Sequence, residues 1–432
     1  MNDRNVGLGG LLRKYRLNTG VTQRQLAELS TLSERAIRDL ESGRARFPRR
    51  DTVRLLADAL RLGETGRAAL EAAAQRHPIG AGPAQLPSLP PAARIDALIG
   101  RESERKSLIE LLSAGSQRWI TLVGLGGVGK TTLAREVATG IHEEGFSVAW
   151  IPPIDDDATT EPDSNGSLLG KALLRSDFDL DGVLRSIGAP DTVLIVDGHD
   201  ATRSPAHPIV ALLRQCPHLR VLVTSRAPYN VPGECVFPLG PLALPTLSEE
   251  ADLPRLAQVP SVRLLLMHLR KMRPGFQLHN NATVVAALCR QLDGLPAAVQ
   301  ISAEWSLIHS PEQLLAQLTN DPFRVISAPE AQRTGFDIHE SVRSALATLE
   351  PGVHKAIIKL ADETSAWSVD DLVKMMRTSS YEAARVVHSL LVLGLIRHSE
   401  ADDSRFTLLN LVRQVQLEIG GSFIGRSRRH IS

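Results

Sequence analysis

One glycine-rich stretch carries the residues best suited to chemistry. Glycines let the backbone curl until several N–H groups point at a phosphate, and a helix N-terminus adds partial positive charge. A lysine at its end would bridge the β- and γ-phosphates, and the threonine after it would offer a hydroxyl to Mg²⁺. The spacing Gly-x-x-x-x-Gly-Lys-Thr therefore predicts a phosphate-binding loop. The stretch reads Gly124, Leu125, Gly126, Gly127, Val128, Gly129, Lys130, Thr131, Thr132.

The flanking segments indicate how this loop is positioned. Residues 119–123 are apolar apart from one threonine, as expected of a buried strand, and the sequence from Leu133 onward has a helical pattern. Thr132 would extend the loop into the first helical turn. A glycine-rich turn with an incidental lysine is the alternative, and the strand, loop and helix order disfavours it.

Two further apolar runs end in charged residues. Val193 to Val196 lead into Asp197, a pattern that predicts a buried parallel strand ending in a carboxylate. This Walker B pattern would deliver Asp197 to the sheet edge where the Mg²⁺ of a phosphate-binding loop lies, so that it holds the metal through water. A third strand, residues 219–226, would end with Arg226 beside the phosphates, although Arg226 could instead pair with an acid.

The N-terminal part of the chain predicts short helices and no strands. Thr22 can cap a helix running to Leu29, Ser33 can cap a second helix running to Glu41, and Gly43 supplies a stop. The short connection between them indicates a helix-turn-helix. Five residues fall where two steeply crossing helices would bury them: Leu26, Ala27, Leu32, Ile37 and Leu40.

Charge is concentrated in the same region. The 432 residues carry a net charge of only +1, but residues 1–76 hold 15 Lys and Arg against 9 Asp and Glu. A basic segment of this kind suits a polyanion. The pattern resembles the Cro and phage-repressor-like (XRE) family of bacterial regulators, and the resemblance implies double-stranded DNA as a partner.

The resemblance also implies which side chains contact DNA. The helix from Ser33 would enter the major groove, and a single copy would bind weakly, so dimerisation or a second contact is implied. A helical bundle that binds protein is the alternative. Expected near base edges are Ser33, Glu34, Arg35 and Arg38, and expected near phosphates are Gln23, Arg44, Arg46, Arg49 and Arg50.

The central and C-terminal motifs resemble the NB-ARC family of STAND-class switch ATPases. Leu98-Ile99-Gly100-Arg101-Glu102 matches the apolar loop that packs on adenine, with Ile99 and Arg101 at the matching positions. The resemblance implies that Arg226 is a sensor of the γ-phosphate and that Asp200 could orient the attacking water, although Asp200 could equally be a cap. Gly294-Leu295-Pro296-Ala297 stands where the family has Gly-Leu-Pro-Leu, and Pro296 would touch the adenine side.

The last part of the chain predicts a winged helix. Helix patterns at 342–349, 355–360, 369–376 and 383–391 precede two short strands at 395–398 and 405–408. The family often carries Met-His-Asp before Leu-Val-Arg, and its histidine contacts the phosphate of ADP. Here residues 408–413 read Leu-Leu-Asn-Leu-Val-Arg, so that histidine is missing. Related regulators continue into a repeat array that senses a signal, but no repeat appears in this sequence.

Composition bounds the remaining possibilities. No apolar run approaches 18 residues and the N-terminus lacks the apolar segment of a signal peptide, which favours a cytoplasmic protein. Cys216, Cys235 and Cys289 are too few and too far apart for a disulfide framework or a zinc site.

The predicted fold class is multidomain α and α/β. The expected parts are an all-α helix-turn-helix bundle (1–76), a proline-rich linker (77–94), a P-loop domain with a parallel sheet (95–245), a helical lid (246–330), a winged-helix domain (331–425) and a basic tail (426–432).

Together these features predict a DNA-binding transcriptional regulator controlled by ATP and ADP with Mg²⁺. Hydrolysis would be slow and would serve a switch, with nucleotide-dependent homo-oligomers and a sensor or signal partner. Two alternatives stay open: a signalling or defence adaptor whose N-terminal bundle binds protein, and a P-loop ATPase that turns over steadily.

Overall fold

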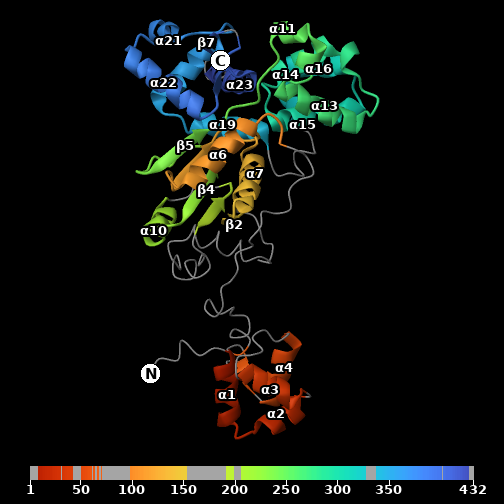
Figure 1. The fold of residues 1–432 in the computed structure, drawn as a ribbon, viewed down its shortest axis with the longest axis vertical. Helices are drawn as coiled ribbons and strands as arrows, with labels where there is room; N and C mark the ends of the chain where they lie inside the picture. The colour runs from red at the N-terminus through yellow and green to blue at the C-terminus, as the bar shows by residue number, and fades with distance from the viewer. Residues whose placement is uncertain are drawn as a thin grey trace. The chain divides into compact units, whose positions relative to one another are not determined.

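The computed structural model forms two compact units, Met1–Pro83 and Ala84–Ser432 (Figure 1). It describes residues 8–30, 32–41, 50–60, 62–63, 66–67, 70, 98–152, 191–198, 206–326, 337–400 and 402–427, apart from the side chains of 8–10, 35, 39, 50, 51 and 421–427. The predictions for Gly43, Arg44, Arg46, Arg49, the linker and Asp200 lie outside these residues, as do most of the basic tail and the side chains of Arg35 and Arg50.

The first unit is a helical bundle. Its helices are α1 (Leu8–Asn18), α2 (Gln23–Ser30), α3 (Glu34–Glu41) and α4 (Arg50–Ala59). Both predicted caps are present, because the Gln25 N–H donates to Thr22 Oγ1 at 3.2 Å and the Ala36 N–H donates to Ser33 Oγ at 3.1 Å. The five predicted apolar residues pack together, with Leu32 the least buried of them.

A buried ion pair ties the ends of this bundle together. The guanidinium of Arg16, on α1, donates to both carboxylate oxygens of Glu41, at the end of α3, and to the carbonyl oxygen of Val21. The Gln23 amide donates to Glu41 Oε2 at 2.8 Å. Burial alone would raise the pKa of Glu41, but the hydrogen bonds from Arg16 and Gln23 outweigh it and hold that pKa below its ordinary value.

The second unit begins with a three-layer α/β domain. The described residues form a five-stranded parallel sheet in the order β2-β3-β4-β1-β5. Its strands are β1 (Trp119–Val123), β2 (Ser147–Ile151), β3 (Thr192–Val196), β4 (Arg220–Ser225) and β5 (Glu234–Pro238). The strands expected near residues 119, 193 and 219 are present, whereas β2 and β5 were not predicted.

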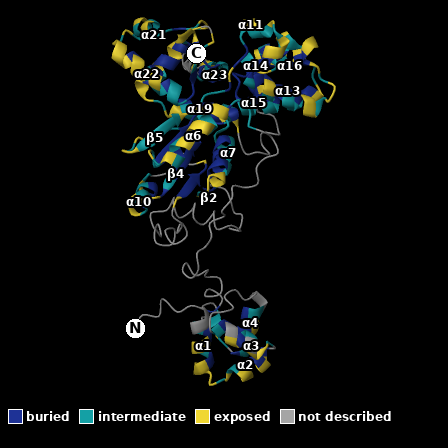
Figure 2. Cartoon of the chain, in the orientation of Figure 1, coloured by how far each residue is buried: buried dark blue, intermediate teal, exposed yellow. Residues whose placement is uncertain are grey.

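Side chains alternate between the two faces of this sheet, and each face has its own helices. Ile120 and Leu122 pack with α6 (Glu102–Ala114) and α7 (Lys130–Glu143), whereas Trp119 packs with α10 (His207–Gln215) on the opposite face. Most of the sheet is accordingly dark blue in Figure 2, where dark blue marks buried residues, whereas β5 is only half-buried. Burial on both faces explains why β1 and β3 are apolar apart from one threonine each.

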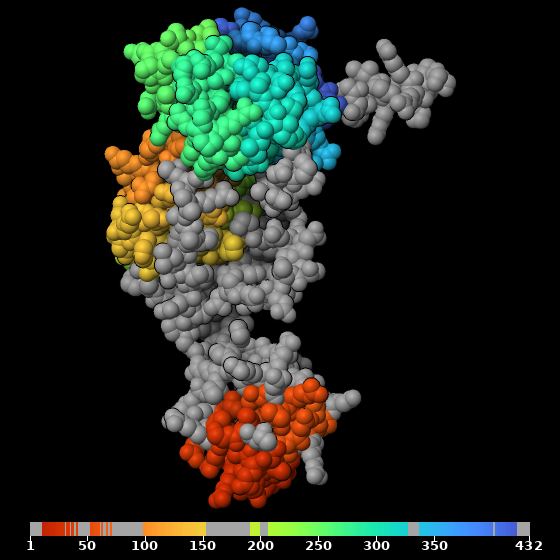
Figure 3. Space-filling view, turned by 90° about the vertical axis from the view of Figure 1, so that its right-hand side faces the viewer, coloured from red at the N-terminus to blue at the C-terminus, as the bar shows by residue number. Residues whose placement is uncertain are grey.

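A helical lid follows β5 in the chain. In Figure 3 its residues form one continuous green to cyan body next to the orange and yellow of α6 and α7. Proline begins α13, α15 and α16, where a missing N–H costs nothing. The helices are α11 (Leu247–Glu250), α12 (Leu253–Leu256), α13 (Pro260–Met272), η1 (Leu278–Asn280), α14 (Ala282–Gln291), α15 (Pro296–Glu304), η2 (Trp305–Leu307), α16 (Pro311–Asn320) and α17 (Pro322–Ile326).

The last part has the winged-helix arrangement that the sequence predicts. Four helices precede an antiparallel hairpin of β6 (Ile396–Ser399) and β7 (Asp402–Leu408), and α23 (Asn410–Ser427) follows (Figure 1). Trp367 forms an isolated antiparallel β-bridge with Phe406 of β7. The four helices are α19 (Ile338–Ala347), α20 (Pro351–Ala361), α21 (Val369–Met376) and α22 (Ser380–Val392).

Cys289 lies fully buried in α14. Burial raises the pKa of its thiol to about 12, so the reactive thiolate form is disfavoured. Among the described residues, no helix is both long and apolar enough to cross a membrane.

Candidate nucleotide site

The glycine-rich loop leaves β1 and enters α7, and two of its glycines meet specific requirements. A Cβ on Gly124 would lie 2.3 Å from the carbonyl oxygen of Leu239, so no larger residue fits there. Gly129, which precedes α7, has a φ of 100°, in the left-handed region that favours glycine. The sequence therefore folds here into the tight turn that directs backbone N–H groups toward one point.

Lys130 folds back over this loop. Its Nζ donates to the carbonyl oxygens of Gly124 at 2.7 Å and Leu125 at 2.9 Å. These bonds hold the ammonium group at the mouth of the loop. A nucleotide β- or γ-phosphate there would offer it a charged acceptor in place of two neutral ones.

Asp197 lies at the carboxyl end of β3 and is fully buried. Its Oδ1 accepts from Thr131 Oγ1 at 2.8 Å and from Thr224 Oγ1 at 2.7 Å, and the Gly198 N–H donates to Thr224 Oγ1 at 2.7 Å. The structure thus joins the first turn of α7 to the ends of β3 and β4. Thr224 was not expected in this cluster, although it directly precedes the predicted Ser-Arg end of β4.

The second carboxylate oxygen of Asp197 bears on which ion this cluster could bind. Asp197 Oδ2 is buried and has no hydrogen-bond partner among the described residues. A buried, unpaired carboxylate oxygen is costly. The hydroxyl of Thr131 and the carboxylate of Asp197 are oxygen donors of the kind Mg²⁺ prefers, so these residues fit a magnesium ion. When bound, such an ion would neutralise charge on the phosphate oxygens.

Arg226 follows β4 and is exposed, with its side chain in none of the hydrogen bonds or ion pairs found among the described residues. The sheet order brings the ends of β1, β3 and β4 to the same edge, because these strands are adjacent and parallel. Arg226 is therefore at the edge where the sequence predicts it, but its role as a sensor stays a prediction. Asp200 lies outside the described residues, so its role also stays a prediction.

The Ile99 to Arg101 loop is anchored against the segment after β5. The Arg101 guanidinium is buried, donates to Glu104 Oε1 at 2.8 Å and donates to the carbonyl oxygen of Gly240. Gly100 has a φ of 67°, and a Cβ there would lie 2.4 Å from Pro260 Cβ. Arg101 therefore positions this loop, while Ile99 is half-buried beside it. Contact of either residue with adenine stays a prediction.

The lid reaches the glycine-rich loop through the start of α15. The Ala297 N–H donates to the carbonyl oxygen of Gly127 at 3.1 Å, and the preceding residue, Pro296, is half-buried. Gly294 has a φ of 62°, and a Cβ there would lie 2.5 Å from the carbonyl oxygen of Leu242. The Gly-Leu-Pro-Ala stretch is thus in direct contact with the loop, while contact of Pro296 with the adenine side of a nucleotide stays a prediction.

The winged helix also contacts this region. Arg397 Nη2 donates to the carbonyl oxygen of Leu242 at 2.9 Å. A Cβ on Gly394 would lie 3.6 Å from the Leu125 amide nitrogen and 3.9 Å from Gly124 Cα. Leu409, in the segment that lacks the family's histidine, is buried, and its N–H donates to the carbonyl oxygen of Leu395.

The expected DNA-contacting residues lie around the start of α3. Ser33 caps this helix, and Arg38 Nη2 pairs with Glu34 Oε1 at 2.9 Å, with both side chains about half exposed. Gln23, expected near phosphates, uses its amide to donate to Glu41. The pair on α3 is available to a partner, whereas Gln23 would have to share its amide.

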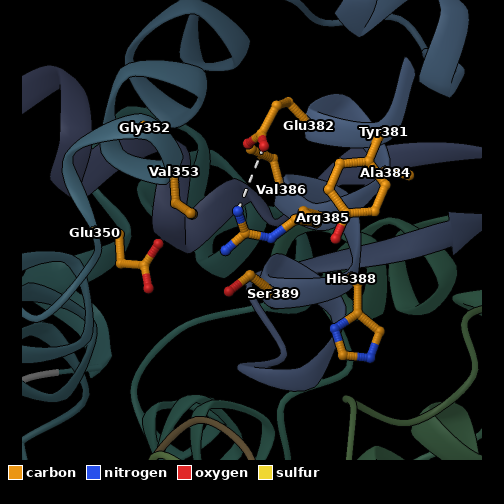
Figure 4. A pocket seen from close by; sticks show the side chains of 10 residues that line it. All are labelled: Glu350, Gly352, Val353, Tyr381, Glu382, Ala384, Arg385, Val386, His388 and Ser389. Carbon is orange, nitrogen blue, oxygen red and sulfur yellow. Dashed lines mark hydrogen bonds and ion pairs between the residues drawn. The ribbon is translucent and has the colours of Figure 1, made fainter. Parts of the chain in front are cut away.

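A separate cavity of about 380 Å³ lies in the winged helix (Figure 4). Figure 4 shows Arg385, paired with Glu382, and Ser389 on its α22 side, facing Glu350 and Val353 at the start of α20. Its lining includes no residue of the glycine-rich loop. The candidate nucleotide site therefore lies at the cluster of Thr131, Thr224 and Asp197, apart from this cavity.

Comparisons with known proteins give matches in two parts of the chain. Residues 8–70 match a helix-turn-helix domain model, and residues 101–152 match the NB-ARC domain model. An uncharacterized protein of Mycobacterium tuberculosis is 28% identical over 241 residues, which are 54% of this chain and 56% of that protein. Another protein of that organism, named "Putative HTH-type transcriptional regulator", is 27% identical over 317 residues, 70% of this chain and 33% of the relative.

The chain thus spans about half the length of the first relatives and a third of the second. A solved structure from Pyrococcus horikoshii, a signal transduction ATPase with numerous domains and a tetratricopeptide repeat sensor, is 14% identical. The alignment covers 78% of this chain and 44% of that one, with a TM-score of 0.29. By its sequence matches and its strand, loop and helix geometry, the chain joins an N-terminal helix-turn-helix domain to a P-loop nucleotide-binding domain of the NB-ARC type.

Proposed function

We propose that this chain is a DNA-binding transcriptional regulator whose activity is set by ATP or ADP in the NB-ARC site. The observation that carries the proposal is that one glycine-rich loop contacts two other parts of the chain. Gly127 accepts from Ala297 of the lid, and Gly394 of the winged helix packs over Gly124 and Leu125. A nucleotide on this loop would therefore bias how the three parts are arranged.

The proposed roles of the site residues follow from their positions. Lys130 would bind the phosphates, Thr131 and Asp197 would hold Mg²⁺, and Ile99, Arg101 and Pro296 would border the base. Arg226 would report the γ-phosphate and Asp200 would orient water. Domain boundaries near residues 76, 94, 245, 330 and 425 are part of the proposal.

Opening of this arrangement would expose surfaces for self-association. Clustered helix-turn-helix heads would then gain affinity for double-stranded DNA, because linking binding modules raises their effective concentration. The relative named as an HTH-type regulator supports an output in transcription. A sensor or signal partner would control the exchange of nucleotide.

The nucleotide part is tested with Lys130→Ala in the full chain. We expect the purified variant to retain less nucleotide and to bind added ADP and ATP at least about ten-fold more weakly than the parent, because a charged hydrogen-bond partner of the phosphates is gone. Nucleotide released on denaturation is identified by chromatography, and oligomer size is measured by light scattering with and without ATP. Unchanged retention together with unchanged oligomer size would contradict the proposal. Turnover of several ATP per second would instead favour a steadily working ATPase.

The DNA part is tested with Arg38→Ala. If Arg38 contacts a base or phosphate, the variant should bind duplex DNA roughly 5- to 100-fold more weakly than the parent, and parent binding should fall steeply with salt. Arg343→Ala is the matched control, since Arg343 pairs with Glu340 at the same 2.9 Å on an exposed helix face of the winged helix. Equal binding by parent and both variants would favour a head that binds protein.

A further inference from the structure

The loop between α14 and α15 connects two regions that are far apart in the sequence. At its end, Ala297 donates to Gly127 of the glycine-rich loop. Four residues earlier, Asp293 reaches the start of α23 in the winged helix. One short segment of the lid therefore touches both the phosphate-binding loop and the winged helix.

Asp293 acts as the N-terminal cap of a helix to which it does not belong. Its Oδ1 accepts from the Asn410 N–H at 2.9 Å and its Oδ2 accepts from the Leu411 N–H at 2.8 Å. The first N–H groups of a helix have no partner within the helix, and the helix dipole favours a negative charge there. A third hydrogen bond, from Asn410 Nδ2 to the carbonyl oxygen of Arg290, joins the same two parts of the chain at 2.9 Å.

This carboxylate is only 3% exposed and depends on the winged helix for its partners. Burial raises the pKa of Asp293 to about 6, while the two N–H groups and the charges of Arg397 and Arg413 oppose that rise. Above that pH the group is ionised, and a buried carboxylate without hydrogen bonds is unfavourable. Asp293 therefore favours the docked position of α23.

The backbone at Asp293 is specialised as well. Its φ is 54°, in the left-handed region, and the next residue, Gly294, has a φ of 62°. Gly294 cannot carry a side chain because of the Leu242 carbonyl, whose oxygen also accepts from Arg397 of the winged helix. The segment from Asp293 to Ala297 is thus held at both ends. A displacement of Ala297 would therefore also move Asp293.

We propose that Asp293 is a positioning residue that couples the glycine-rich loop to the winged helix by capping α23 from the lid. In this chain, where leucine and asparagine occupy 409 and 410, the lid carboxylate adds a second link between nucleotide site and winged helix, beside the direct packing of Gly394 against the glycine-rich loop. Its regulatory meaning rests on the proposed nucleotide function, but the docking itself does not.

The experiment uses the full chain with Asp293→Ala and Asp293→Asn. Asparagine keeps the size of the side chain and tolerates a positive φ, but it can accept from only one of the two N–H groups. The matched control is Asp191→Asn, because Asp191 has a φ of 61°, is 58% exposed and pairs only at the surface with Arg220.

Two measurements separate coupling from general stability. In nucleotide-free protein, protease cleavage between the lid and the winged helix should become roughly ten-fold faster in Asp293→Asn and faster still in Asp293→Ala, with the control unchanged. A fluorescent ADP analogue should protect the parent from this cleavage, and that protection should be lost in the Asp293 variants even at saturation.

The outcomes are distinct. Unchanged cleavage and protection in Asp293→Ala would overturn the coupling role. A lower melting temperature with nucleotide protection intact would assign Asp293 a merely structural role and would also overturn it. If the parent binds no ADP, the proposed function fails, but the nucleotide-free cleavage rates still decide whether Asp293 holds the winged helix in place.

Discussion

Thr224 shows how much of the nucleotide site depends on a single buried hydroxyl. It donates to Asp197 and accepts from the Gly198 N–H, so it fixes the carboxylate whose other oxygen is unpaired. We expect Thr224→Val to lower the free energy of unfolding by about 2 kcal/mol, because the buried carboxylate of Asp197 and the Gly198 N–H each lose a hydrogen-bond partner. Mg²⁺-dependent nucleotide binding should weaken about ten-fold. Calorimetric titration with and without Mg²⁺ measures this.

Thr121→Val is the control for that substitution. Thr121 is equally buried, lies on the neighbouring strand β1 and accepts a hydrogen bond from Trp119 Nε1 at 3.0 Å. It should therefore lower stability to a similar degree without changing the Mg²⁺ dependence. If both variants affect nucleotide binding equally, Thr224 contributes only to the stability of the sheet.

At the scale of elements, the ion pair between Arg16 and Glu41 links α1 to α3 in the helix-turn-helix head. Because the pKa of Glu41 is held below its ordinary value in the folded state, its stabilisation is present above the unfolded pKa and is lost as pH falls below about 4.5. Glu41→Gln should destabilise the head at pH 7 by about 3 kcal/mol, the cost of leaving Arg16 buried without its partner. The Glu41→Gln substitution should also make the stability of the head less dependent on pH in acid, because residue 41 can no longer take up a proton.

Thermal unfolding of the full chain followed between pH 3 and 7 measures this effect. Glu28→Gln is a suitable control, since Glu28 pairs with Arg24 on the surface with both side chains mostly exposed. A variant at position 41 whose acid unfolding matches that of the parent would show that the buried pair contributes no pH dependence.

Sequence patterns predicted the elements whose residues obey a local rule. The P-loop, the strand before Asp197 and the Thr22 and Ser33 caps depend on spacing within about ten residues, and all are present. Strands β2 and β5 were missed, because β2 begins with an exposed serine and runs directly into two prolines, and β5 is only half-buried. Asp293 was missed because its partners lie more than a hundred residues away, a separation that no local pattern encodes.

At the scale of the second unit, three parts of the chain converge on the glycine-rich loop and on the segment that follows β5 beside it. Arg101 binds the segment after β5, Ala297 binds Gly127, and Arg397 binds Leu242. In each of these hydrogen bonds the acceptor is a backbone carbonyl oxygen. The contacts between the three parts therefore depend on the path of the main chain in the glycine-rich loop and in the segment after β5. The loop thus has little space to change shape unless its neighbours move too.

Gly394 gives the most direct test of that convergence. A Cβ at this position would lie 3.6 Å from the Leu125 nitrogen and the Leu239 oxygen, so the branched carbons of valine would collide with the loop or push the winged helix away. We expect Gly394→Val to release bound nucleotide at least about ten-fold faster than the parent. Stopped-flow release of a fluorescent ADP analogue measures the rate.

Gly145→Val separates this collision from backbone strain. Gly145 has a φ of 94°, also in the left-handed region, but a Cβ there meets nothing within 4 Å. Both substitutions impose a strained φ on valine, and only the one at 394 adds atoms against the glycine-rich loop. Faster release in Gly394→Val alone would mean that winged-helix packing retains the nucleotide. Equal release rates in the two variants would mean that the loop holds its ligand without help from the winged helix.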